Sequence, residues 1–260
     1  MFGYDRNGNL IERRHEDERT SFSWDGADRL VSLTRFEERE RSAVSFAYDG
    51  DGNLLRETRT GEDEDDRPRS LRYTLDLAGP LSQVLSASDG RDEVAFLYGL
   101  SRIAAFGRET RFYGADVRRS VRSLTDERGK VAGVQSYDVW GVPKDEGEGS
   151  AKLASLFGFT GERQDSKAGL VYLRARWYMP ELGRLRLMSR DPIRGQPAAP
   201  RTLNPYAYAL DDPTTHLDLT GLSASDLLNG SQAGGTGGGP GSLLPTGSEP
   251  SPDAGFTYSF

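Results

Sequence analysis

Three near-copies of one short motif restrict the fold of this chain more than any other feature of its sequence. They read FGYDRNGNLIERR from Phe2, FSWDGADRLVSLTRF from Phe22 and FAYDGDGNLLRET from Phe46. Copies at spacings of this order indicate a repeat architecture, in which each unit buries its apolar face against its neighbours. The chain is therefore expected to be built from stacked copies of one supersecondary unit.

The motif itself predicts a β-hairpin. An aromatic residue (Tyr4, Trp24 or Tyr48) ends a strand, and the aspartate that follows bonds backbone N–H groups further along the turn. Glycine takes the left-handed position, and an Asn-Leu pair begins the return strand. Segments such as LSQVLSA, VAFLY and RRSVRSLTD alternate as half-buried strands do. We therefore expect a mainly β fold made of a ribbon of repeated hairpins.

The composition limits both the core and the class of partner. Only 35% of the 260 residues are hydrophobic and the mean hydropathy is -0.63, so the core must come from Tyr, Phe and Trp or from surface shared with further segments. A net charge of -7 and a pI near 5.1 argue against nucleic-acid binding. The arginine cluster from Arg163 to Arg194 has two interpretations, pairing with the many acidic residues or forming a local basic patch.

The residue inventory excludes several kinds of site. The absence of cysteine removes disulfides and thiolate chemistry, and with only His15 and His216 we expect neither a metal site nor a cofactor. No apolar run approaches the length of a membrane helix, and the N-terminal residues do not resemble a signal peptide. From Gly230 to Gly241 the chain is almost entirely Gly, Ser, Thr and Pro, so we expect a disordered tail over residues 223–260.

A series of ordered motifs follows the repeats. They are RSVRSLTDERG from Arg119, QSYDVWGVP from Gln135, FTGERQDSKAGLVYLRARWYMP from Phe159, GRLRLMSRDP from Gly183, NPYAYALDDP from Asn204, and DLTGL ending at Leu222. In this order they resemble the RHS repeat-associated core domain, and the aromatic-Asp repeats resemble the YD or RHS repeats of the same family. The resemblance covers the whole chain up to Leu222.

The resemblance implies a β-strand ribbon that spirals into a hollow shell, closed by a core or plug domain. It implies YD repeats over residues 1–110, the core domain over 111–222 and the tail over 223–260. The shell of related proteins encloses a C-terminal toxin. The implied partners are further RHS repeat segments or a secretion-system or toxin protein, and the implied location is exported or at the cell surface as part of a larger assembly.

The resemblance also implies a single-turnover aspartic autopeptidase that cuts after the Gly-Leu pair. The family motifs place the catalytic groups on Arg176, Asp191 and Asp218, and the cleaved bond between Leu222 and Ser223. Two carboxylates held together cannot both ionise, so they share a proton, and one accepts a proton from water while the other donates to the peptide carbonyl. Arg176 is expected to hold the developing oxyanion or to orient a carboxylate.

Several observations leave alternatives open. Each aspartate is also of the type that opens a turn by bonding local backbone, and Arg176 is also placed to stack on a neighbouring aromatic ring. The chain departs from the family pattern in four ways: Met179 in place of Asp, Leu219 in place of Pro, Asp211-Asp212 in place of an Asn pair, and two additional residues between Gly183 and Asp191. The alternative functions are a non-catalytic module that binds carbohydrate or protein, and a truncated remnant of a larger RHS protein.

Overall fold

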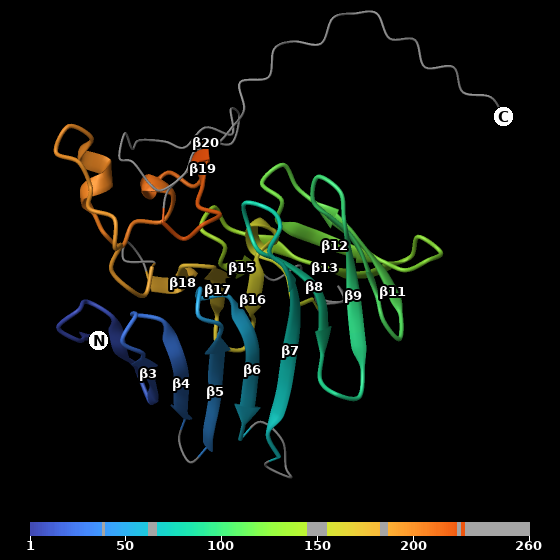
Figure 1. Ribbon diagram of the computed structural model, residues 1–260, viewed down its shortest axis with the longest axis horizontal. Coiled ribbons are helices and arrows are strands. Elements are labelled where there is room, and N and C mark those ends of the chain that lie inside the picture. The colour runs from blue at the N-terminus through green and yellow to red at the C-terminus, as the bar shows by residue number, and fades with distance from the viewer. Residues whose placement is uncertain (38–39, 62–66, 145–154, 183–186, 223–224, 227–260) are drawn as a thin grey trace, which may run out of the picture.

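One antiparallel sheet dominates the computed structural model, which describes residues 1–37, 40–61, 67–144, 155–182, 187–222 and 225–226. Its thirteen strands lie in chain order, each paired with the next (Figure 1). They are β1 (Phe2–Tyr4), β2 (Leu10–His15), β3 (Glu18–Trp24), β4 (Leu30–Glu37), β5 (Glu40–Tyr48), β6 (Leu54–Thr60), β7 (Arg69–Asp76), β8 (Gln83–Ser88), β9 (Glu93–Tyr98), β10 (Arg102–Phe106), β11 (Thr110–Ala115), β12 (Val121–Thr125) and β13 (Val131–Val134). The predicted mainly β ribbon of hairpins is confirmed. The boundary at residues 110 and 111 stays a prediction, and the sheet crosses it without interruption.

The predicted hairpin turns form in all three copies, but in the second copy Asp28, with φ +57°, takes the left-handed position that the motif assigns to glycine. Oδ1 of Asp5 accepts hydrogen bonds from the backbone N–H groups of Asn7 and Asn9, at 2.9 and 2.8 Å. Asp25 and Asp49 make the same pair of bonds in their own turns. Because one carboxylate oxygen holds two N–H groups, five residues of sequence are enough to reverse the chain.

The same turn recurs beyond the three copies that the sequence analysis identified. Oδ1 of Asp116, Asp126 and Asp138 each accepts two backbone N–H groups, from the residues two and four positions later. Two of these aspartates follow Ala115 and Thr125 rather than an aromatic residue. The aspartate therefore specifies the turn, whereas the aromatic residue, where present, packs against the hydrophobic core.

The C-terminal elements are short. They are β14 (Ser136–Tyr137), β15 (Pro143–Lys144), β16 (Arg163–Asp165), β17 (Leu170–Leu173), β18 (Arg176–Tyr178), β19 (His216–Leu217), β20 (Ser225–Asp226), and the 3-10 helices η1 (Phe159–Gly161), η2 (Pro180–Leu182), η3 (Pro200–Leu203) and η4 (Ala209–Asp211). We call residues 155–222 the core segment. Its central sheet, β16-β17-β18, lies across the large sheet (Figure 1). Of the predicted tail, only residues 225–226 are described, as strand β20 paired with β19.

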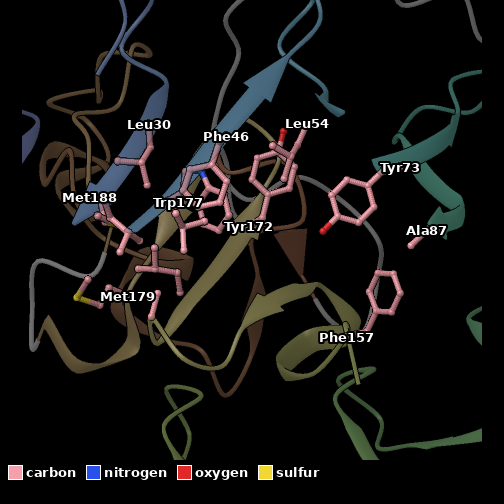
Figure 2. Close-up of a cluster of buried hydrophobic side chains, with 14 of the residues drawn as sticks. Leu30, Phe46, Leu54, Tyr73, Ala87, Phe157, Tyr172, Trp177, Met179 and Met188 are labelled. Carbon is pink, nitrogen blue, oxygen red and sulfur yellow. The ribbon is translucent and has the colours of Figure 1, made fainter. Parts of the chain in front are cut away.

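Aromatic side chains join the core segment to the large sheet. The ring of Trp177 lies 4.6 Å from that of Phe46, and Phe157 packs edge-on against Phe96 at 5.0 Å. The indole N–H of Trp177 also donates to the Tyr48 hydroxyl at 2.9 Å. Figure 2 shows Trp177 in the middle of this cluster, with Phe46 directly against it. Aromatic rings, which bury a large apolar area per residue, thus supply part of the core together with buried aliphatic residues such as Leu30 and Leu54.

Buried ion pairs cross the same interface. Glu57 on β6 contacts the guanidinium of Arg163 on β16, and Arg59 lies 2.7 Å from Asp165. The Nε of Arg163 donates to the Tyr73 hydroxyl at 2.7 Å. Breaking such a pair would leave a buried charge unpaired, so these contacts favour one placement of the core segment on the sheet. For Arg163, the interpretation as an arginine that pairs with acidic residues is confirmed.

Within the described part of the chain, no helix has both the length and the apolar character needed to cross a membrane.

Candidate functional site

Arg176 brings together the two aspartates that the sequence analysis assigned to cleavage. It is the first residue of β18 and is 4% exposed. Its Nη2 lies 2.8 Å from Oδ2 of Asp191 and 3.8 Å from Oδ2 of Asp218. Its Nη1 donates to the carbonyl oxygen of Pro205 at 3.0 Å, and its Nε donates to the carbonyl oxygen of Gly221. All three guanidinium nitrogens are thus used, and they join three separate segments of the chain.

Each aspartate uses its two oxygens differently. Oδ1 of Asp191 accepts the backbone N–H of Ile193 at 2.8 Å, and Oδ1 of Asp218 accepts that of Gly221, also at 2.8 Å. The Oδ2 atoms are the ones that face Arg176. The turn interpretation is therefore confirmed for both aspartates, and it is compatible with a paired site because a carboxylate accepts several hydrogen bonds. Among the described residues, no aromatic ring stacks on Arg176, and the arginine that lies over the Trp177 ring is Arg163.

Burial governs the charges at this site. Burial raises the pKa of Asp191 above its ordinary value of 3.8, and the positive charge of Arg176 opposes the shift. Burial likewise lowers the pKa of Arg176, opposed by Asp191 and then Asp218. The Asp218 side chain is 3% exposed, against 16% for that of Asp191. Asp191 is thus the more accessible carboxyl and holds a proton to higher pH than an ordinary aspartate.

The chain after Asp218 lies directly on the turn between β17 and β18. The N–H of Ala175 donates to the carbonyl oxygen of Thr220 at 3.1 Å. Gly221 has φ +75°, and a Cβ there would fall against the carbonyl oxygen of Leu173 and 2.9 Å from the backbone nitrogen of Arg176. Only glycine fits this conformation and this space without strain. The glycine of the Gly-Leu pair is therefore needed for the approach that brings its carbonyl to Arg176.

Of the two residues that flank the predicted cleavage bond, the structure describes only Leu222. The N–H of Leu222 donates to the hydroxyl of Thr220 at 3.2 Å, and Leu222 is half-buried. Ser223 lies outside the described residues, as do residues 183–186, which hold part of the predicted insertion before Asp191. The carbonyl that Arg176 binds belongs to Gly221, one residue before Leu222.

The structure accommodates the other departures from the family motif. Met179 is 2% exposed and belongs to the same hydrophobic core cluster as Trp177 (Figure 2). Asp211 has φ +58°, a left-handed conformation that aspartate and asparagine both tolerate. The carbonyl oxygen of Leu219 accepts a hydrogen bond from Nη1 of Arg174 at 2.6 Å. The sequence analysis did not assign Arg174, Pro205 or Gly221 to the site. The Arg-Ala-Arg motif is a signal for Arg174, whereas Pro205 and Gly221 contribute backbone carbonyls, which leave no signal in a sequence.

Known relatives match this chain over most of its length. The RHS Repeat family model matches residues 4–40. Toxin protein Tse5 of Pseudomonas aeruginosa is 33% identical over 255 residues, which cover 85% of this chain and 18% of that protein. The tRNA nuclease WapA of Bacillus subtilis is 29% identical over 223 residues, covering 84% and 9%. The chain thus spans less than a fifth of the length of these relatives.

Solved structures share the fold at lower sequence identity. The Tc holotoxin pore of Photorhabdus luminescens has a TM-score of 0.64 and 18% identity, covering 84% of this chain and 10% of that one. TcdB2-TccC3 without its hypervariable C-terminal region has a TM-score of 0.60 and 19% identity, covering 78% and 10%. The matched repeat, the ordered motifs that run to Leu222 and this shared fold show that the chain belongs to the RHS-repeat, or YD-repeat, protein family.

Proposed function

We propose that this chain forms part of an RHS-type shell around a C-terminal cargo region and cuts itself between Leu222 and Ser223. The observation that carries the proposal is the contact of one guanidinium nitrogen of Arg176 with both carboxylates, at 2.8 Å to Asp191 and 3.8 Å to Asp218. Aspartic chemistry needs such a pair, because two carboxylates that share a proton supply an acid and a base together. The same arginine binds the carbonyl oxygen next to Leu222, so the pair lies close to the proposed bond.

In the proposed reaction, Asp218 takes a proton from a water molecule whose oxygen attacks the carbonyl carbon of Leu222. Asp191 donates its proton to the carbonyl oxygen, a role that its raised pKa suits. The tetrahedral intermediate then collapses: the carbonyl oxygen returns its proton to Asp191, the C–N bond breaks and the nitrogen of Ser223 takes the proton held by Asp218. The products are a carboxyl group on Leu222 and an amine on Ser223. Because the bond is tethered to the carboxyl pair, no substrate-binding site is required.

The shell role is supported by the edges of the large sheet. In the part of the chain that the structure describes, β1 pairs only with β2 and β13 pairs only with β12. An edge strand offers unpaired backbone groups to another strand. We propose that further RHS repeats, or a partner protein of the toxin assembly, pair at these edges and extend the sheet around the cargo.

Intact mass spectrometry of the purified chain tests the cleavage proposal. We expect the parent to give a product that ends at Leu222, and the isosteric Asp191→Asn variant to remain uncut because it cannot donate a carboxyl proton. The matched control is Asp17→Asn, which removes an exposed carboxylate in the turn between β2 and β3. It should cut as the parent does. A full-length mass for the parent, in the pH range where Asp191 holds its proton, would refute self-cleavage and favour the non-catalytic binding module.

A further inference from the structure

Arg174 occupies the turn between β17 and β18 in an unusual backbone conformation. Leu173 and Arg176 pair across this turn, so Arg174 is the first of its two central residues. Its φ is +63°, in the left-handed region that residues with a Cβ seldom adopt. Hairpin turns of this length usually place glycine or asparagine there. Such a conformation persists where surrounding contacts compensate for it, and the Arg174 side chain makes several.

The guanidinium of Arg174 joins three segments. Its Nη1 donates to the carbonyl oxygen of Leu219 at 2.6 Å and lies 3.0 Å from Oε2 of Glu162. Its Nε and Nη2 both donate to the carbonyl oxygen of Ser82, at 3.3 and 3.2 Å. Ser82 lies in the loop before β8, and Glu162 immediately precedes β16. The loop before β8, the residue before β16 and the residue after Asp218 therefore meet at one side chain.

Three successive residues after Asp218 contact this one turn. Arg174 holds the carbonyl of Leu219, and the N–H of Ala175 holds that of Thr220 at 3.1 Å. Gly221 packs against the backbone of the turn and donates its N–H to Oδ1 of Asp218 at 2.8 Å. Leu219 stands where the similar family motif has proline, whose ring would restrict the backbone at this position. The hydrogen bond from Arg174 restrains the same backbone from outside.

We propose that Arg174 is a positioning residue for self-cleavage: it holds the Leu219 carbonyl so that the Asp218 carboxylate faces Arg176. The proposal rests on the proposed function, because it assigns Arg174 a role in the same reaction. Arg174 itself shows no contact with Asp191 or Asp218 among the described residues, so it acts through the backbone of the loop.

Glu162 keeps the Arg174 guanidinium in place. The Glu162 side chain is 13% exposed, and burial raises its pKa, opposed by the positive charges of Arg174, Arg102 and Arg119. The Glu162 carboxylate and the Leu219 carbonyl share Nη1 of Arg174, so the pair fixes the direction of this nitrogen. We expect Glu162→Gln to weaken the hold of Arg174 on the Leu219 carbonyl less than removal of the arginine does, because glutamine keeps an oxygen acceptor but lacks the charge.

Two measurements on the full chain test the proposal, with Arg174→Ala, Arg174→Lys and a control. The first is the rate of cleavage, followed by intact mass over a range of pH. We expect Arg174→Ala to slow cleavage by about 10²-fold without changing the shape of the pH profile, because a displacement of about 1 Å has this effect. Arg174→Lys should recover part of the rate, since lysine reaches one acceptor but lacks the planar fork. The control Arg13→Ala breaks a different contact between sheet and core segment, the 3.2 Å pair with Glu181, and should cut normally.

The second measurement is amide hydrogen exchange of peptides that cover residues 216–222, in chains that carry Asp191→Asn so that they stay uncut. We expect Arg174→Ala to speed exchange in these peptides and to leave β3 to β5 unchanged. If the parent cuts and Arg174→Ala cuts equally fast, the positioning role is refuted while the proposed function stands. If the parent does not cut, the proposed function fails, and the exchange measurement alone tests whether Arg174 holds the loop after Asp218. Equal exchange at residues 216–222 with and without Arg174→Ala, or faster exchange across the whole sheet, refutes the positioning role.

Discussion

Replacement of Gly221 by alanine tests how closely the chain after Asp218 packs on the β17-β18 turn. Gly221 has φ +75°, and an added Cβ would meet the carbonyl oxygen of Leu173 and lie 2.9 Å from the nitrogen of Arg176. A left-handed alanine costs about 1–2 kcal/mol. Forcing an extra methyl group into a packed site costs about 1–3 kcal/mol more. We therefore expect Gly221→Ala to lower the free energy of unfolding by about 2–5 kcal/mol.

Gly129→Ala is the matched control for this prediction. Gly129 has nearly the same backbone angle, φ +76°, but a Cβ there would meet nothing within 4 Å. It should therefore lose only the conformational part, about 1–2 kcal/mol. Urea unfolding of both variants, in chains that carry Asp191→Asn to prevent cutting, measures the difference. If the two variants lose equal stability, the close approach of Gly221 to Leu173 and Arg176 has no energetic weight and the packing argument is wrong.

Three further predictions concern pH and the core. Because the pKa of Asp191 is raised above 3.8 and its protonated form is the proposed donor, the cleavage rate should fall as pH rises through that pKa, as measured by intact mass at each pH. Hydrogen bonds from Asn53 lower the pKa of Asp49, and a hydrogen bond from the backbone of Lys130 lowers the pKa of Asp126. These two carboxylates should therefore stabilise the fold above the ordinary pKa of 3.8, and this stabilisation should disappear as pH falls through their lowered pKa values. Unfolding followed by circular dichroism at each pH measures the change. Trp177→Ala should cost about 3–5 kcal/mol in urea unfolding; a loss below about 1 kcal/mol would show that Trp177 does not anchor the core segment.

The hairpins were predictable because their chemistry is local. Asp5 and Gly8 form one turn through contacts within five residues, so the motif is readable without knowledge of the rest of the chain. The aromatic-Asp motif does not identify the turns at Asp116 and Asp126, because Ala115 and Thr125 stand in place of the aromatic residue. The spacing of an aspartate and a left-handed residue three positions later was the more general signal.

The candidate site was predictable in part. Resemblance to family motifs selected Arg176, Asp191 and Asp218, and these three side chains meet in the structure. Arg176 also binds the backbone carbonyls of Pro205 and Gly221, which every residue type carries and which no motif can therefore single out. The role of Met179 as a core residue was equally invisible, because burial depends on what packs around it.

The sequence by itself determined the turns, the alternation of the strands and the residue types available for chemistry, since each of these depends on neighbours a few positions away. Only the tertiary structure decided which face of the sheet the core segment covers, and which of the many arginines pairs with which acid. Arg176 meets Asp218 and Arg163 meets Glu57 across long stretches of chain. Such contacts form where the aromatic cluster around Trp177 docks the core segment on the sheet, because burial of charge is stable only where the surrounding fold supplies the partner.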